Sequence, residues 1–331
     1  MWNFSMRRSL ALMVQTMPFI LLRCAIYFGI ALAYILFTGM GAGVGWSIGA
    51  LGDDGFQTSA SIWGGVAGFG ITAAILYFLR EYLLYMVKAG HIAVLVYLID
   101  GQPLPEGRSQ IAQAQQVVKS RYAQANVLFA LDQIVKGVIV AITGLVQGVA
   151  SILPIPGISQ LMGLVRAFLR LAVGLVDEVI LAYAIRTESQ NPWSSAQTAL
   201  VLYGQNGKNM LKNAAWLALF TYGLAFLVFL VMLAPAAAVV YMIPGAWSAG
   251  GFLFALVFAW AVKAALIEPF AIACMLQAYF QAIEGQEPDQ EWEDRLDGVS
   301  AKFRKLKDKA ADWARGRPTD DAEPARAGTG S

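Results

Sequence analysis

Six stretches of this chain are each long and apolar enough to cross a lipid bilayer. A transmembrane helix needs about 20 mostly apolar residues. Such runs occupy residues 24–43, 60–79, 127–152, 158–185, 214–243 and 246–277. Composition agrees, because 58% of the residues are hydrophobic and only 14% are charged, against about 25% charged in soluble domains. The sequence therefore predicts an all-α membrane protein with six transmembrane helices.

The lysines and arginines alternate with these stretches in a way that indicates orientation. None occurs in residues 44–59, in the turn 152–159 or in the turn 244–250, and the first of these carries Asp53 and Asp54. The intervening segments hold Arg7, Arg8, Arg80, Lys88, Arg108, Lys119, Arg121, Arg186, Lys208, Lys212 and nine more from Arg295 onward. Because basic residues stay on the cytoplasmic side, we predict cytoplasmic termini in a bacterial inner (plasma) membrane.

The spans pair into three hairpins, and the chain divides into four parts. We expect a cytoplasmic or interfacial segment at 1–23, a six-helix transmembrane domain at 24–285, a cytoplasmic amphipathic helix at 286–316 and a disordered tail at 317–331. The tail RPTDDAEPARAGTGS is too polar to pack into a core.

The three hairpins leave the membrane through similar sequences. These are YLIDGQPLPEG (97–107), YAIRTESQNPW (183–193) and FQAIEGQEPDQ (280–290). One interpretation is a true triplication, since repeats occur at fixed structural positions. The other is that helices leaving a membrane commonly end in Gly, Pro and acidic residues. The sequence leaves both interpretations open.

The segments that follow the exits are amphipathic. In 191–209, Asn191 can cap a helix and Pro192 suits its first position, and Asn206–Gly207 would end it. We expect this helix to lie on the inner membrane surface, and residues 108–126 resemble it in a more polar form.

The third amphipathic segment carries a heptad seam. Its members are Trp292, Leu296, Val299, Phe303, Leu306, Ala310 and Trp313. A coiled coil between subunits of a homo-oligomer is one interpretation. A helix lying on the anionic inner leaflet or on the underside of the protein is the other, and the aromatic seam residues favour it.

Glycines recur every fourth residue in the first hairpin. Gly41, Gly45 and Gly49 precede the turn, and Gly64 and Gly68 follow it. This spacing is typical of helices that approach closely in lipid. A permeation path lined by glycine backbone is the alternative.

Eight ionisable residues lie inside the predicted spans, where charge is expensive and usually paired or functional. They are Asp132, Lys136, Arg166, Arg170, Asp177, Glu178, Lys263 and Glu268. We treat them as a candidate intramembrane charge network.

Depth along the helices suggests how these charges pair. Lys136 and Asp177 each lie about nine residues, roughly 13 Å, from the cytoplasmic end of neighbouring helices, so we predict that Lys136 pairs with Asp177 or Glu178. Lys263 and Glu268 are five residues apart, which makes direct pairing less natural in an α-helix. The network either fixes helix register or forms a polar path for transport.

Other chemistry has little support. One histidine, His91, and two cysteines in apolar runs, Cys24 and Cys274, exclude a multi-histidine metal site and a disulfide framework. We expect His91 to be an interfacial or packed side chain. We predict no enzymatic activity, no cofactor and no nucleic-acid partner.

The region from residue 176 to residue 309 resembles the C-terminal part of the choline transporter-like family. A membrane helix leads there to a short segment with Ser195–Ala196 and Asn206, then two spans, then an acidic end. The resemblance implies passage of a small organic solute such as choline. The longest outer loop here, 44–59, is about sixteen residues, too short for the large extracellular domain of that family. No binding residues are therefore carried over.

Two functions follow from the sequence. The repeated hairpins and the charge network favour a transporter or channel for a small organic solute, embedded in the lipid bilayer. The amphipathic cytoplasmic segments favour a non-transporting membrane scaffold or assembly factor.

Overall fold

The computed structural model describes residues 2–102, 109–121, 131, 134–142, 177–242 and 250–316, without the side chains of 78–83, 85, 117–121 and 177. Every element in these ranges is helical. They are α1 (Met6–Gln15), α2 (Met17–Gly49), α3 (Asp54–Ile99), α4 (Gln110–Arg121), α7 (Asp177–Arg186), α8 (Pro192–Gln205), α9 (Gly207–Met242), α10 (Gly250–Val262), a π-helical turn η1 (Lys263–Ile267), α11 (Glu268–Ala282), α12 (Gln290–Val299) and α13 (Ala301–Gly316).

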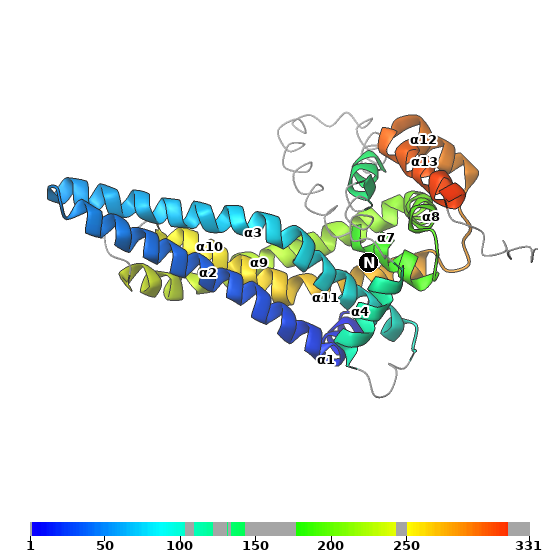
Figure 1. Ribbon diagram of the computed structural model, residues 1–331. Coiled ribbons are helices and arrows are strands. Elements are labelled where there is room, and N and C mark those ends of the chain that lie inside the picture. The colour runs from blue at the N-terminus through cyan, green and yellow to red at the C-terminus, as the bar shows by residue number, and fades with distance from the viewer. Residues whose placement is uncertain are drawn as a thin grey trace, which may run out of the picture.

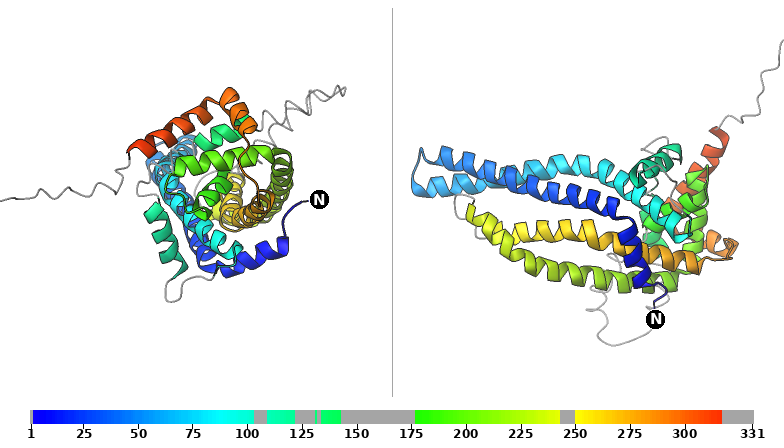
Figure 2. Two further views of the ribbon diagram at one scale, coloured as in Figure 1. Left: turned by 90° about the vertical axis from the view of Figure 1, so that its right-hand side faces the viewer. Right: turned by 90° about the horizontal axis from the view of Figure 1, so that it is seen from below.

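These helices form two parts (Figures 1 and 2). The membrane bundle consists of α2, the first half of α3, α9 and α10, which run alongside one another. The helical body gathers at one end of the bundle and contains α1, α4, α7, α8, α11, α12, α13 and the second half of α3. The helices nearest the two termini, α1 and α13, both lie in this body.

Four helices among the described residues are long and apolar enough to cross a membrane. They are Met17–Gly49, Asp54–Tyr77, Gly207–Met242 and Gly250–Ala282. Their length and composition suit an integral membrane protein. The spans predicted at 127–152 and 158–185 fall largely outside the described residues, as do the turns 152–159 and 244–250. The six-span count and the three-hairpin arrangement therefore stay predictions.

The described parts of those two stretches lie in the helical body. Ile139 and Ile180 are fully buried there, in one core with Leu200 and Tyr279. Gly137 faces the side chain of Lys302 on α13. These segments thus pack against amphipathic helices, which was not expected of membrane spans.

Glycines hold α2 and α3 together, as the sequence predicted. A Cβ atom added to Gly41 would lie 2.2 Å from the Gly64 carbonyl oxygen, and one added to Gly45 would lie 2.0 Å from the Ala60 carbonyl oxygen. The two backbones are therefore in contact, which only glycine allows. At the turn, Asp53 caps α3 by accepting from the Phe56 N–H at 2.7 Å.

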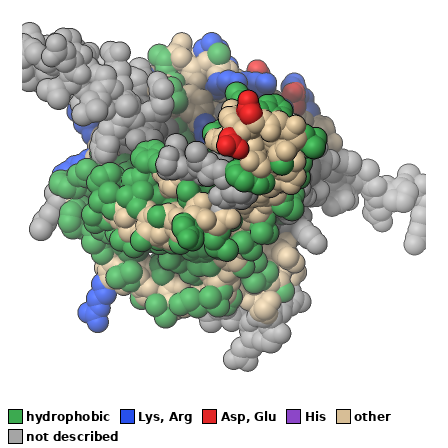
Figure 3. Space-filling model, turned by 90° about the vertical axis from the view of Figure 1, so that its left-hand side faces the viewer, with side chains coloured by type: hydrophobic (Ala, Val, Ile, Leu, Met, Phe, Trp, Pro, Cys, Tyr) green, Lys and Arg blue, Asp and Glu red, His purple; other side chains and the backbone are tan. Residues whose placement is uncertain are grey.

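Large apolar side chains on the bundle point outward. Leu36 on α2 and Phe226 on α9 are each more than half exposed. Figure 3 looks onto the end of the molecule where α2 turns into α3, and hydrophobic side chains cover much of its described surface. This outward apolar face is what contact with lipid requires.

The helix α3 is much longer than the span predicted at 60–79. Its 46 residues extend about 69 Å, roughly twice the thickness of a bilayer core. Its second half enters the helical body, where Ala89 and Leu95 are fully buried. The apolar pattern continues past residue 79 without a proline, so nothing local ends the helix there.

The helix α8 begins and ends as predicted, but it is not a surface helix. The Asn191 side chain accepts from the N–H groups of Trp193 and Ser194, each at 3.2 Å, and Pro192 follows in the first turn. The expectation that this helix lies on the membrane surface was wrong. Most of its residues are buried, because α12 and α13 cover it and α7 packs against it.

The heptad seam packs onto the chain's own body. Leu296, Phe303, Leu306 and Ala310 are buried against the core that includes α8. The seam is not one continuous helix, since α12 ends before Ser300 and Val299 is half exposed. The tail predicted to be disordered, 317–331, lies outside the described residues.

Candidate functional site

Five charged side chains meet where the membrane bundle joins the helical body. We call them the junction cluster: Arg23 of α2, Lys88 of α3, Glu178 of α7, Lys263 of η1 and Glu268 of α11. One Glu268 oxygen, Oε1, lies 3.8 Å from both Arg23 Nη2 and Lys88 Nζ, and Oε2 lies 3.8 Å from Lys263 Nζ. Lys88 also pairs with the buried Glu178.

A π-helical turn brings Lys263 and Glu268 together. In an α-helix, residues five apart point about 140° away from each other. Here the Glu268 N–H donates to the Lys263 carbonyl, five residues back, which widens the turn. The sequence argument against this pairing assumed a regular α-helix. The pairing forms because the π turn rotates Glu268 towards Lys263, which a regular α-helix would not do.

The same turn leaves one carbonyl without a backbone partner. The Ala264 carbonyl would accept from residue 269 in the π pattern, but Pro269 has no N–H. Arg23 replaces the missing donor, since its Nε and Nη2 donate to the Ala264 oxygen at 3.1 and 2.8 Å. A side chain of α2 thus completes the backbone hydrogen bonding of the helix that runs from α10 into α11.

The described side chains of the cluster carry three positive charges and two negative ones. Arg23 is 1% exposed, and its Nη1 has no hydrogen-bond partner among the described residues. Lys88 and Lys263 are each about one-fifth exposed. A buried charge is stable only when it is paired and hydrogen-bonded. The partly exposed ammonium groups of Lys88 and Lys263 are therefore accessible to an anionic group.

The structure places only part of the predicted network. Glu178, Lys263 and Glu268 come together in the junction cluster. Asp132, Arg166, Arg170 and the side chain of Asp177 lie outside the described residues. The predicted pairing of Lys136 with Asp177 or Glu178 therefore stays a prediction.

Sequence reasoning missed Arg23 and Lys88 as partners. Arg23 stands at the edge of the first apolar run, and Lys88 lies beyond the predicted end of the second. The signal that could have found Lys88 is the unbroken helical pattern of α3.

His91 packs one helical turn beyond Lys88, as expected of a structural histidine. It is buried, stacks on Phe19 with ring centroids 5.1 Å apart, and contacts the Thr16 hydroxyl at 2.9 Å. That hydroxyl donates to the Leu12 carbonyl at 2.8 Å, so His91 Nε2 donates to Thr16. Burial, and secondarily the charge of Arg23, lower the pKa of His91 to about 3.

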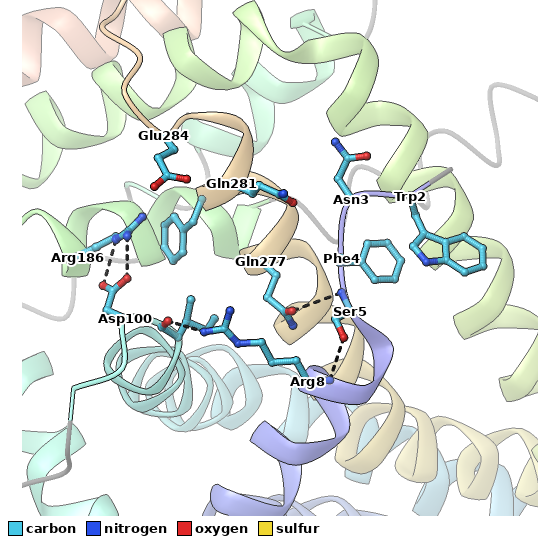
Figure 4. Close-up of a pocket in the computed structure, with 12 residues that line it drawn as sticks. Trp2, Asn3, Phe4, Ser5, Arg8, Asp100, Arg186, Gln277, Gln281 and Glu284 are labelled. Atoms are coloured by element: carbon cyan, nitrogen blue, oxygen red, sulfur yellow. Dashed lines mark hydrogen bonds and ion pairs between the residues drawn. The ribbon is translucent and has the colours of Figure 1, made fainter.

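A cavity of about 810 Å³ lies in the helical body. Its volume falls within the range of small-molecule sites. The walls combine aromatic, amide and charged side chains, as Figure 4 shows. The lining residues are Trp2, Asn3, Phe4, Ser5, Arg8, Ile99, Asp100, Arg186, Gln277, Phe280, Gln281 and Glu284. We call it the exit cavity, because all three predicted membrane exits contribute to its walls, together with the N-terminal segment.

The three exits share a backbone feature. Each contains a residue in the left-handed region: Gly101 after α3, Glu188 after α7 and Gly285 after α11. Among the described residues, these are the only three with positive φ. A left-handed residue ends a helix by turning the chain away. The exits thus resemble one another in structure, while the triplication itself stays a prediction.

Arg186 ties the three exits together. Its Nε and Nη2 bind the Asp100 carboxylate at 3.0 and 2.7 Å, and its guanidinium lies 4.3 Å from the centre of the Phe280 ring. Arg8 adds a fourth element, since its Nη2 donates to the Ile99 carbonyl at the end of α3, at 2.7 Å. A planar guanidinium suits both the bidentate pair and the stacking.

The N-terminal segment forms one wall of the exit cavity. The Asn3 N–H donates to Asn213 Oδ1 at 3.0 Å, and the Ser5 N–H donates to Gln277 Oε1 at 3.4 Å. Figure 4 shows Phe4 and Trp2 beside these contacts. Two backbone hydrogen bonds therefore hold this non-helical segment at the cavity.

Comparison with known protein families, with curated proteins and with solved structures finds no match for this chain.

Proposed function

We propose that this protein carries a small organic solute across the membrane. The exit cavity would receive the solute, and the junction cluster would bind it or its coupling proton. One observation carries the proposal: α3, α7 and α11 each contribute a residue to both places.

The two places lie at successive levels along these helices. Lys88 precedes Ile99 on α3, Glu178 precedes Arg186 on α7, and Glu268 precedes Phe280 on α11. Separations of eight to twelve residues correspond to about 12–18 Å. The cavity and the charge cluster would then be two successive stations at one end of the transport path.

The irregular helix at the junction adds support. Transporters commonly bind substrate where a membrane helix departs from regular α geometry, and π turns are frequent at functional sites. The turn η1 lies between Lys263 and Glu268, two members of the cluster. We further propose that the helical body and both termini face the cytoplasm of a bacterial inner membrane, since the outer turn with Asp53 and Asp54 has no lysine or arginine.

The test is solute flux into proteoliposomes that contain the full chain. Choline, amino acids and organic anions would be compared, with and without a pH gradient. Glu178→Gln removes a charge from the cluster, and Asp308→Asn removes one from an exposed position on α13 as the matched control. We expect flux to fall at least about tenfold in the first variant, as for loss of an essential charged group, and to be unchanged in the second.

A charge swap separates transport from simple stability. The double variant Lys88→Glu, Glu178→Lys restores the ion pair with its polarity reversed. Recovery of thermal stability without recovery of flux would support a transport role. Recovery of both thermal stability and flux would show that the pair has only a structural role. Absence of flux for every solute in the wild type would refute the proposal.

A second candidate is a non-transporting membrane scaffold. Glu268 contacts three cations on three different elements. Such contacts would also hold these helices in a fixed position relative to one another, which favours this candidate. In that case the charge variants would lower thermal stability, and no solute would move at all.

A further inference from the structure

An apolar groove of about 400 Å³ runs along the membrane bundle beside the junction cluster. It lies between α2, α3 and α10. Its lining includes Ile30, Tyr34, Phe69, Leu76, Tyr77 and Trp260. A hydrophobic groove on a membrane-facing bundle is filled by lipid chains, because no water is present there.

On α2 the groove leads directly to Arg23. Tyr34, Ile30, Tyr27 and Arg23 follow one another at steps of four, three and four residues, so they share one face. The Tyr27 ring lies 5.2 Å from that of Trp260, and the Arg23 guanidinium lies 5.8 Å from the Tyr27 ring. A continuous row of side chains on α2 therefore connects the apolar groove to the buried guanidinium of Arg23.

On α10 and the turn η1 that continues it, the same order is repeated. Leu256, Trp260 and Lys263 follow at steps of four and three residues, and the first two line the groove. On α3, Phe69, Leu76 and Tyr77 line it and Lys88 lies further along in the same direction. All three helices thus place the cations at the same end of the groove.

That end lies near the level expected for lipid headgroups. Counting about 20 residues, or 30 Å, back along α2 from Gly49 ends near Gly29, and Arg23 lies beyond it. The same count along α9 from Met242 ends near Tyr222, whose ring lies 5.0 Å from Lys263 Nζ. Tyrosine is typical of the membrane interface.

From this geometry we infer that the groove and the junction cluster together bind one anionic phospholipid. Its acyl chain lies in the groove, and its phosphate contacts the partly exposed ammonium groups of Lys88 and Lys263. The partly exposed ammonium groups of Lys88 and Lys263 favour a negative headgroup over a zwitterionic one, as does the Arg23 Nη1, which lacks a hydrogen-bond partner among the described residues. Basic sites between membrane helices recognise acidic lipids in this way. The inference does not depend on the proposed transport.

Native mass spectrometry of the full chain in detergent tests the site. Dioleoyl-phosphatidylglycerol and dioleoyl-phosphatidylcholine are added separately, and bound lipid is counted for each variant. Lys263→Gln removes an accessible charge, Ala73→Trp fills the groove, and Lys305→Gln is the control on the exposed face of α13. Thermal unfolding establishes that each variant is folded, and Lys263→Arg should behave as the wild type.

We expect phosphatidylglycerol to bind more tightly than phosphatidylcholine. Lys263→Gln should weaken the phosphatidylglycerol complex roughly fivefold with little change for phosphatidylcholine, and Ala73→Trp should weaken both. Equal binding of the two lipids by the wild type would overturn the inference. Displacement by inorganic phosphate, together with unchanged binding in Ala73→Trp, would also overturn it, by showing a phosphate site without a lipid chain.

Discussion

The membrane bundle and the helical body are both made of helices, but different forces hold them together. In the bundle, α2 and α3 touch through glycine backbone, and large side chains such as Leu36 and Phe226 point outward. In the body, large side chains such as Tyr203 and Phe303 are fully buried. Lipid gives no reward for burying apolar side chains, so close backbone packing replaces it. Water does reward burial, and the body uses it.

The largest effect should come from removing a buried ring in the helical body. In Phe303→Ala we expect the docking of α13 to lose about 3–5 kcal/mol, because Phe303 is fully buried. Phe226→Ala on the outward face of α9 is the control, with an expected change below about 0.5 kcal/mol. Hydrogen exchange of α12 and α13 measures the first effect. Equal losses of stability in both variants would show that burial of large side chains does not distinguish the helical body from the membrane bundle.

A methyl group at the glycine contact should be nearly as damaging to the bundle. In Gly45→Ala the new Cβ would lie 2.0 Å from the Ala60 carbonyl oxygen, and overpacking of this kind destabilises by about 3 kcal/mol. Gly43→Ala on the same helix has no atom within 4 Å and should be neutral or slightly stabilising. The midpoints of unfolding by a denaturing detergent are compared for the two variants. Similar midpoints would contradict a direct backbone contact between α2 and α3 at Gly45.

Acidification should destabilise the body through His91. Its folded pKa of about 3 lies below the usual 6.5, so the stabilisation is complete above pH 6.5 and is lost as the pH falls towards 3. Between pH 7 and pH 5 we expect a loss of about 1–2 kcal/mol. The variant His91→Phe keeps the ring stack on Phe19 and should lose less. The thermal unfolding midpoint in detergent measures the effect. An equal fall for both proteins on acidification would show that His91 is not shielded from water.

The smallest effect should come from the ion pair at the exit cavity. Arg186 and Asp100 are partly exposed, at 38% and 18%, and such pairs contribute at most about 1 kcal/mol. A double-mutant cycle with Asp100→Asn and Arg186→Gln measures the coupling between them. A coupling energy well above this value would mean that the pair is shielded from water as a buried pair is.

The sequence was informative wherever local pattern decides structure. Span length and apolarity predicted α2, α9 and the helix from α10 into α11, and Asn191 with Pro192 predicted the start of α8. Glycine spacing predicted the α2–α3 contact, because only small residues let backbones touch. Each of these features depends on residues within a few turns of one another.

What the sequence could not show depends on tertiary contacts. The burial of α8 depends on α12 and α13, about a hundred residues later in the chain. The pairing of Lys263 with Glu268 depends on a π turn, for which no residue type is diagnostic. The exit cavity combines short segments from four separate regions, so no single motif marks it.

The hydrogen bonds from Arg23 to the Ala264 carbonyl have a consequence for biogenesis. Arg23 precedes Ala264 by 241 residues in the chain, so the donor is synthesised long before the irregular turn that it completes. The earlier helix can then act as an intramolecular chaperone for the later one, supplying the donor that Pro269 lacks. The order of the helices along the chain thus makes the Arg23 donor available before the turn η1 needs it.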